Sequence, residues 1–209
     1  LHKFYKEYAY QKNGPFASLL TGPTGSGKTP IMACWISELL KAATVNNVVW
    51  TARQYELLIH AQKELIKWGV SESDIYHIQS SDEYNNLIGE NPCNKHNYKV
   101  FLISAQLCNS KKIEYEKETD ILIYDEAHHL NENGEETKNL LDLIKHKILI
   151  GMSATPFRTD PYEDKSFMEK LFPAKFGLDQ HLSKHNRGYI YFMDSTEAYS
   201  GALVNSFGE

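Results

Sequence analysis

Short apolar runs alternate with longer amphipathic stretches along most of the chain. The runs have the length and continuous apolar character of buried strands, and they cover residues 16–20, 48–51, 75–78, 99–103, 121–124 and 147–151. The stretches between them that have helix length are 29–42, 54–68 and 135–145. Within the second of these, one helical face carries Leu57, Leu58, Ala61, Leu65 and Trp68. Strands that alternate with helices predict βαβ units, and therefore a parallel sheet covered on both faces.

The pattern is weaker in other parts of the chain. Residues 80–97 are rich in Ser, Asp, Glu and Asn, which favours an exposed excursion between two strands. Beyond Pro156 we expect a short helix at 167–172 and a strand at 188–193 that leads out of the domain. The chain starts without Met and ends without an obvious stop signal, so we expect it to be a piece of a longer protein.

The composition is typical of a soluble globular protein, with 42% hydrophobic and 23% charged residues in a chain of 209. No apolar stretch approaches the roughly 18 residues that span a membrane, and the charged, aromatic N-terminus is no signal peptide. We therefore expect no membrane partner and a cytoplasmic location, or a nuclear one in a eukaryote. Three widely spaced cysteines predict a reducing compartment rather than a disulfide framework.

Net charge and metal-ligand spacing add little to this picture. The net charge of −5 is no global signature of nucleic-acid binding, although a local groove can be basic on an acidic protein. Cys93 and His96 are close in sequence, but no second pair completes a zinc site.

A phosphate-binding loop of the form G-x-x-x-x-G-K-T follows the first apolar run. It consists of Gly22, Pro23, Thr24, Gly25, Ser26, Gly27, Lys28 and Thr29. Glycines let backbone N–H groups turn toward a triphosphate, and the start of the following helix adds unpaired N–H groups. Lys28 can reach the outer phosphates, and the Thr29 hydroxyl can hold Mg²⁺. The alternative is a chance Gly-rich turn, which the flanking strand and helix disfavour.

An acidic pair, Asp125 and Glu126, comes directly after the predicted strand 121–124. In open α/β sheets, ligands bind outside the carboxyl ends of the strands, so this pair can face the phosphate loop. We assign Asp125 to Mg²⁺ and Glu126 to the attacking water. The alternative is an acidic cluster that only complements a helix dipole, and the phosphate loop upstream makes it the weaker interpretation.

Small hydroxyl residues follow the last predicted strand, in the run Ser153, Ala154, Thr155 and Pro156. Such residues at a strand end can form hydrogen bonds with the carboxylate and histidine of the acidic motif. Taken alone, the run is better explained as a turn in which Pro156 stops the strand.

In this order, the motifs resemble those of the superfamily 2 helicases and translocases. GPTGSGKT (22–29) looks like motif I, DEAH (125–128) like motif II and SATPFR (153–158) like motif III. The additional histidine after DEAH, His129, is more similar to the restriction-enzyme and repair-translocase branch. The resemblance implies an α/β fold of the RecA-like P-loop NTPase type, with a mostly parallel β-sheet and helices on both faces.

The resemblance also implies cofactors, partners and roles. The cofactors would be ATP and Mg²⁺, with Lys28 and Glu126 as the catalytic residues. Coupling of the nucleotide state to strand movement would fall to His128, Ser153, Ala154 and Thr155. Backbone contacts with nucleic acid, DNA in preference to RNA, would come from Thr51, Arg53 and Ser104. The alternative for these last three is that they are only exposed residues at strand ends.

The resemblance covers about residues 16–160, so we expect a RecA-like ATP-binding domain at 1–160. Residues 161–209 would then be a connector toward a second RecA-like domain. No Q-x-x-G-R-x-x-R pattern is present, so an arginine finger would have to come from that second domain. Two details depart from the family pattern: Pro30 follows the loop directly, and Gln11 lies too close to it for an adenine-reading glutamine.

The predicted function is therefore the ATP-binding half of a helicase or translocase, in which hydrolysis drives strand movement. Alone, this half would bind nucleotide but hydrolyse it poorly. One alternative is a nucleotide-dependent regulatory or motor module of a restriction or defence complex that unwinds nothing. A small-molecule phosphotransferase is a further alternative, but it leaves the DEAH and SATP runs without a role.

Overall fold

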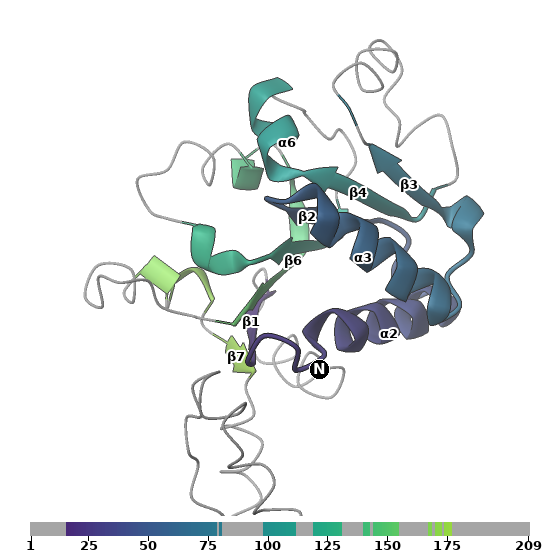
Figure 1. Ribbon diagram of the computed structural model, residues 1–209, viewed down its shortest axis with the longest axis horizontal. Helices are drawn as coiled ribbons and strands as arrows, with labels where there is room; N and C mark the ends of the chain where they lie inside the picture. The colour runs from purple at the N-terminus through teal and green to yellow at the C-terminus, as the bar shows by residue number, and fades with distance from the viewer. Residues whose placement is uncertain are drawn as a thin grey trace, which may run out of the picture.

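The computed structural model describes residues 16–78, 80, 98–111, 119–130, 140–142, 144–154, 167–168, 170–172 and 174–176. Strands in these residues form one 7-stranded sheet in the order β3-β4-β2-β5-β6-β1-β7 (Figure 1). Their bounds are β1 Phe16–Thr21, β2 Val48–Ala52, β3 Ile75–Ile78, β4 Val100–Ser104, β5 Thr119–Asp125, β6 His146–Ser153 and β7 Ala174–Phe176. Every neighbouring pair is parallel, as the alternation of strands and helices predicts.

Two helices that connect the strands, at 28–41 and 55–67, lie close to where the sequence pattern predicts them, whereas the helix at 105–111 has no counterpart among the predicted ones. The bounds are α2 Lys28–Lys41, α3 Tyr55–Lys67 and α6 Ala105–Lys111, with short 3₁₀ turns η1 Glu72–Asp74 and η2 Ala127–His129. The helix predicted at 135–145 is observed at 140–142 but does not reach its predicted end. Ile144 and Lys145 already lie outside the helix, and the Lys145 carbonyl accepts a hydrogen bond from the Thr119 N–H at the start of β5.

Each face of the sheet is covered by its own hydrophobic core. Because side chains alternate along a strand, Ile121 and Ile123 of β5 face one core while Leu122 and Tyr124 face the other. The first core is closed by α2 and α3 (Figure 1). The second is closed by α6, by η2 and by the buried side chains of Leu140, Ile144, Met168 and Phe172. The result is the predicted arrangement with helices on both faces.

The sheet continues beyond residue 160, where the sequence predicts the first domain to end. Strand β7 pairs with β1, with Ala174 opposite Ser18. Just before it, Phe172 is fully buried in the second core. This part of the chain is therefore packed into the same unit as the phosphate loop. The predicted strand at 188–193 and most of the predicted excursion at 80–97 lie outside the described residues.

The carboxyl ends of the parallel strands meet at one edge of the sheet. In β5, Asp125 lies opposite Ala52 of β2 and Met152 of β6. In β1, Thr21 lies opposite Ser153 of β6. This edge of the sheet therefore brings together the phosphate loop, the acidic pair Asp125 and Glu126, and Ser153. None of the helices in the described residues has the length and apolar character needed to cross a membrane.

Candidate active site

The phosphate loop depends on glycine at two positions, and at a third, Gly22, glycine leaves room for the Ser26 side chain. Gly25 and Gly27 have φ angles of +78° and +84°, a left-handed conformation that residues with a Cβ rarely adopt. At Gly22, a Cβ would lie 2.7 Å from the Ser26 hydroxyl oxygen, so the Ser26 side chain would have to rotate away to make room for it. The Ser26 N–H donates to the Pro23 carbonyl over 3.1 Å and closes the turn. The loop is therefore narrow, and residues 23–26 are exposed.

Helix α2 begins directly at the end of this loop, with Gly27 as its N-cap. The first turn of α2 contains no acidic residue, and no side chain caps it. The partial positive charge of the helix start is consequently available to an anion. An anion in the loop would be held by backbone N–H groups that need no side chain.

Lys28 lies in the loop with its ammonium group close to two backbone carbonyls. Its Nζ donates to the carbonyl oxygens of Gly22, over 2.8 Å, and Pro23, over 3.1 Å. Burial lowers the pKa of Lys28, while the negative charges of Glu126 and Asp125 act against this change. The present hydrogen-bond partners of the lysine are thus two neutral carbonyls. A phosphate group, which is charged, would be a stronger acceptor for the ammonium group.

Asp125 ends β5 with its side chain buried, only 4% exposed. This burial, together with the nearby charge of Glu126, raises the pKa of Asp125 to about 6. The Glu126 N–H donates to Asp125 Oδ1 over 2.9 Å, and this bond and Lys28 favour the ionised form. A buried carboxylate with so little compensating charge is suited to receive a cation.

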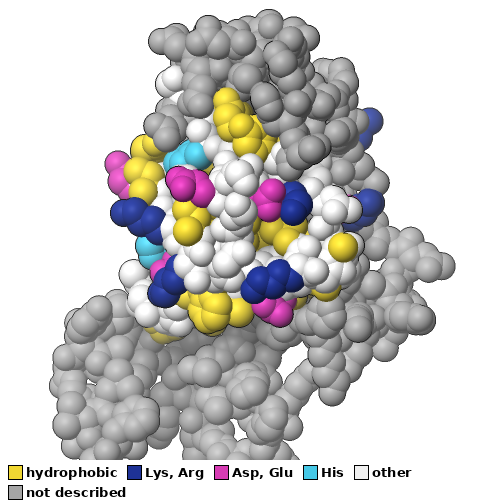
Figure 2. All heavy atoms as spheres, turned by 90° about the vertical axis from the view of Figure 1, so that its right-hand side faces the viewer, with side chains coloured by type: hydrophobic (Ala, Val, Ile, Leu, Met, Phe, Trp, Pro, Cys, Tyr) yellow, Lys and Arg dark blue, Asp and Glu magenta, His cyan; other side chains and the backbone are white. Residues whose placement is uncertain are grey.

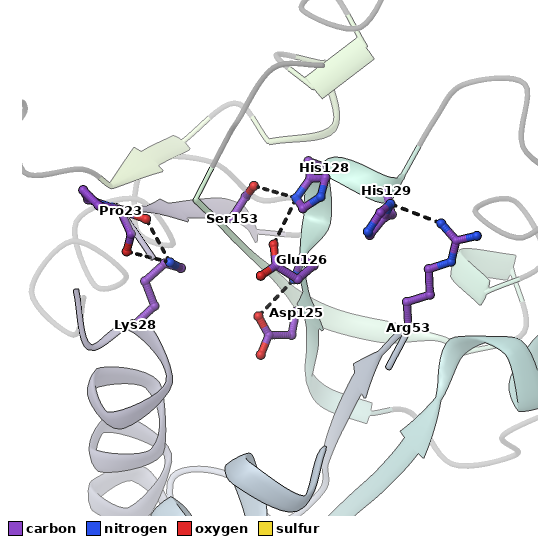
Figure 3. A network of polar contacts seen from close by, with 9 residues as sticks. Pro23, Lys28, Arg53, Asp125, Glu126, His128, His129 and Ser153 are labelled. Carbon is purple, nitrogen blue, oxygen red and sulfur yellow. Dashed lines mark hydrogen bonds and ion pairs between the residues drawn. The ribbon is translucent and has the colours of Figure 1, made fainter. Parts of the chain in front are cut away.

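Glu126 is held in a left-handed backbone conformation, with φ 56° and ψ 50°. Such a conformation is uncommon for a residue with a Cβ and is found often at functional sites. Its Oε2 lies 3.0 Å from Nδ1 of His128 in the turn η2. The same Nδ1 lies 3.1 Å from the Ser153 hydroxyl oxygen, so His128 sits between the two (Figure 3).

Ser153 connects the three motifs. Its side chain contacts His128 of the DEAH run, and its backbone carbonyl accepts a hydrogen bond from the Gly22 N–H over 3.3 Å. It is fully buried at the end of β6, the strand between β1 and β5. A movement of the phosphate loop would therefore be transmitted to His128 through one intermediate residue, Ser153.

The residues predicted to contact nucleic acid differ in their accessibility. Arg53 is exposed just after β2, and its guanidinium Nη1 lies 3.2 Å from Nδ1 of His129. Ser104 is partly exposed at the end of β4, and its hydroxyl accepts from the Leu107 N–H, which caps α6. Thr51 is fully buried in β2. This burial argues against the contact predicted for Thr51, because its side chain does not reach the surface.

The remaining predicted site residues are also located at this edge where the structure describes them. Thr29 lies in the first turn of α2 and Ala154 directly follows β6, both partly exposed, while Thr155 lies outside the described residues. Within the described ranges, His, Cys, Asp and Glu side chains nowhere form a group of three that could hold a metal. Asp125 and the Thr29 hydroxyl are oxygen donors of the kind that Mg²⁺ prefers, and Mg²⁺ usually takes few protein ligands.

His129 is the site residue whose contact sequence reasoning did not predict. The sequence shows it only as a second histidine after DEAH. In the structure its ring lies 4.2 Å from the His128 ring, centroid to centroid, while its Nδ1 faces Arg53 (Figure 3). Arg53 and His129 are 76 residues apart in sequence. No local spacing could have indicated this contact, because only the pairing of β2 with β5 creates it.

The family described as type III restriction enzyme, res subunit (ResIII) matches residues 2–158 of the chain. No curated protein matches the chain. Among solved structures, the UvsW helicase from bacteriophage T4 is similar with a TM-score of 0.58 and 17% identity, and the match covers 77% of this chain and 54% of that one.

Two further solved structures show the same fold. The Hef helicase domain of Pyrococcus furiosus has a TM-score of 0.55 and 18% identity over 90% of this chain and 40% of that one. The Sulfolobus solfataricus SWI2/SNF2 ATPase core in complex with dsDNA has a TM-score of 0.57 and 18% identity over 79% and 33% of the two chains. The chain thus spans about half or less of these proteins, and at such identities the likeness shows the fold alone.

The family match and the similar solved structures confirm the resemblance to superfamily 2 helicases that the three motifs indicate. The similar structures also confirm the predicted RecA-like α/β fold. The match of the ResIII family extends over most of the chain, including the phosphate loop and the acidic pair. The chain therefore belongs to the type III restriction enzyme res subunit family.

Proposed function

We propose that this chain is the ATP-binding and hydrolysing half of a nucleic-acid translocase or helicase, with DNA as its track. The observation that carries the proposal is the junction at the sheet edge. Burial lowers the pKa of Lys28 in the phosphate loop, and the negative charges of Glu126 and Asp125 act to raise it. Ser153 forms hydrogen bonds with both the phosphate loop and the DEAH run. A loop that only bound nucleotide would not need a second carboxylate motif linked to it in this way.

Each residue at the junction has a chemical role in this proposal. The loop N–H groups and Lys28 bind the phosphates of ATP, and Thr29 and Asp125 hold Mg²⁺. Bound Mg²⁺ supplies positive charge that offsets the charge of the phosphates. Glu126 accepts a proton from, or orients, the attacking water, since it is the partly exposed carboxylate of the pair.

Coupling to movement follows from the contacts of Ser153. Its hydroxyl contacts Nδ1 of His128, and the same Nδ1 contacts Oε2 of Glu126. The phosphate loop and the carboxylate assigned to water activation are therefore connected through Ser153 and His128. We assign coupling to His128 and Ser153, with Ala154 and Thr155 as the segment that follows them. Ala154 directly follows β6 at the carboxyl edge of the sheet, so a change in the site would reach this segment first through Ser153.

Nucleic acid would lie at the same edge, against Arg53 and Ser104. The solved SWI2/SNF2 ATPase core is in complex with dsDNA, which supports DNA as the track. The chain covers 33% to 54% of the similar solved chains, which supports a second RecA-like domain reached through the residues after β7. That domain would supply the arginine that completes the site.

A nucleotide titration tests the first step of this function. We expect the chain to bind a fluorescent ATP analogue with Mg²⁺, and Lys28→Ala to weaken binding about tenfold or more, since a hydrogen bond to a charged group contributes about 1.5–3 kcal/mol. Lys41→Ala is the matched control, because Lys41 is an exposed lysine at the other end of the same helix. Equal affinities for wild type and Lys28→Ala would refute the proposed site.

Hydrolysis separates this half from the complete motor. We expect the 209-residue chain to turn over ATP slowly, and the complete protein that contains it to turn over ATP faster by about 10³-fold with DNA present. Robust DNA-stimulated hydrolysis by the 209-residue chain would contradict the need for a second domain.

The ResIII match favours a second candidate, a motor of a restriction complex that moves along DNA without unwinding it. This candidate uses the same ATP site and differs in its product. Displacement of a triplex-forming strand without separation of the duplex would support it. Release of single strands from a duplex would instead support a helicase.

A further inference from the structure

Helix α2 contains a proline in its first turn, directly after the residues assigned to phosphate and Mg²⁺. With Gly27 as the N-cap, the first three helical residues are Lys28, Thr29 and Pro30. Backbone N–H groups at these positions have no acceptor within a helix and are left for side chains, water or a ligand. Proline has no N–H group, so the start of α2 offers two such donors where another residue at position 30 would give three.

The donor that is missing at Pro30 is not replaced by its neighbours. The Ile31 N–H donates to the Gly27 carbonyl over 3.0 Å, so this group is already used within the helix. Gly27 has no side chain that could cap the helix, and the first turn of α2 contains no acidic residue. An N–H group at position 30 would thus lack both an intrahelical and a capping acceptor, and a bound phosphate would be its partner.

A proline in a first helical turn also has an ordinary structural explanation. Its fixed φ suits the helix, and it removes an N–H group that Gly27 cannot cap. If this were its whole role, replacement of Pro30 by alanine would lower the stability of the chain and would not strengthen nucleotide binding. Its position beside Lys28 and Thr29 predicts stronger binding, because the restored N–H adds a donor to the phosphate loop.

We propose that Pro30 limits the affinity of the loop for the phosphates that ATP and ADP have in common. This inference rests on the proposed function and concerns the release of its product. In phosphate loops of this form, backbone N–H groups hold the inner phosphates and the lysine reaches the outer ones. The missing donor therefore weakens the binding of ATP and ADP by the same factor, and ADP dissociates faster. Discrimination between the two nucleotides stays with Lys28 and Mg²⁺.

The test measures binding to the 209-residue chain with Mg²⁺, by displacement of a fluorescent ATP analogue. The competitors are ATP, ADP, inorganic tripolyphosphate and adenosine, so the contributions of the phosphates and of the nucleoside are measured separately. Pro30→Ala restores the N–H group in a residue that favours helices, and Pro30→Gly restores it in a more flexible one. Ile31→Ala is the matched control, since it shortens an exposed neighbour whose N–H is already bonded.

We expect Pro30→Ala to bind ATP, ADP and tripolyphosphate about tenfold more tightly than wild type, the size expected for one hydrogen bond to a charged group. Its affinity for adenosine should equal that of wild type. Dissociation of a fluorescent ADP, followed by stopped flow, should slow by the same factor. Pro30→Gly should also bind more tightly than wild type, although it should unfold at a lower urea concentration. Ile31→Ala should match wild type.

Three results would overturn the inference. The first is that Pro30→Ala, or Pro30→Gly if the alanine variant does not fold, binds tripolyphosphate no more tightly than wild type. The second is an equal gain in affinity for adenosine, and the third is a gain for ATP alone. Urea denaturation without nucleotide shows whether each variant is folded. If wild type binds neither ATP nor tripolyphosphate, the proposed function fails instead, and the two failures are thus distinct.

Discussion

At the residue scale, the site depends on the carboxylate of Asp125, which the fold buries although burial disfavours its ionised form. Asp125 is buried, and its burial raises its pKa from 3.8 to about 6. A folded-state pKa above the unfolded value means that ionisation opposes folding. The opposition is absent below pH about 4, grows between pH about 4 and about 6, and is fully present above the folded-state pKa. We interpret this cost as the consequence of keeping a buried carboxylate ready for a cation.

Asp125→Asn should therefore stabilise the chain and impair its function. A shift of about two pKa units corresponds to about 3 kcal/mol, which is the upper bound of the gain in the free energy of unfolding at pH 7.5. The gain should shrink toward pH 5, where wild-type Asp125 is mostly protonated. Urea denaturation at the two pH values, without Mg²⁺, measures the difference.

Asp120 provides the matched control for this experiment. Burial acts to raise its pKa, but hydrogen bonds from the N–H groups of Asn46 and Asn47 and from Lys147 outweigh it, so the pKa is lowered. The ionised form of Asp120 thus supports folding at neutral pH, and this support is lost as the pH falls. Asp120→Asn should destabilise the chain at pH 7.5, opposite in sign to Asp125→Asn. Equal signs for the two variants would refute this account of Asp125.

At the element scale, strand β6 is placed by a close approach that only glycine allows. A Cβ on Gly151 would lie 2.6 Å from the Phe172 ring, 2.9 Å from Leu19 and 3.0 Å from Ala127. Gly151 therefore lets Phe172 pack on the sheet next to η2. Since η2 carries His128, this packing helps to position the acidic motif beside Ser153.

Gly151→Ala should destabilise the chain by about 1–3 kcal/mol, the usual cost of an overpacked core. Combination with Phe172→Leu should recover part of the loss, because the shorter side chain leaves room for the new methyl group. Chemical denaturation of the single and double variants measures both effects. Additive losses in the double variant would show that Phe172 is not the residue that meets the methyl group.

Elements were predictable to different degrees, for reasons that lie in their length and pattern. Strand β5 is a continuous apolar run and α3 has a clear apolar face, so both were evident from sequence. Strand β7 is only Ala-Lys-Phe, and its identity as a strand comes from its pairing with β1. Helix α6 is short, and its start depends on the cap from Ser104, a residue for which sequence reasoning favoured a binding role.

At the scale of the whole molecule, the described surface carries basic and acidic side chains side by side. A nucleic acid would therefore be attracted by individual cationic residues and not by the overall charge. The chain has a net charge of −5, and on the face in Figure 2 basic and acidic side chains are interspersed. Ion pairs such as Lys41–Glu38 and Lys67–Glu64 use some of these charges locally. Attraction of a nucleic acid would therefore depend on a few groups such as Arg53 at the carboxyl edge of the sheet.

Arg53→Ala should weaken binding of the complete protein to DNA and reduce the slope of log affinity against log salt by about one, the value for one lost phosphate contact. Lys63→Ala, which removes an exposed charge from α3, is the matched control and should leave the slope unchanged. Fluorescence anisotropy over a salt series measures the slope. A slope equal to that of wild type would remove Arg53 from the proposed interface.

The sequence by itself determined the order of elements, the parallel sheet and the identity of the chemical groups. These follow from local physics: apolar periodicity, the glycines that a tight loop needs, and the residue types that bind phosphate and Mg²⁺. Lys28, Asp125 and Glu126 could be named because each motif is contiguous in the chain.

The tertiary structure alone decided which of these groups meet. It placed Ser153 against both motifs, buried Thr51 away from the surface, and brought Arg53 to His129. Contacts between distant residues depend on strand order and register, and side-chain types do not encode these locally. The burial of Asp125 has the same origin, since its neighbours come from β2 and β6.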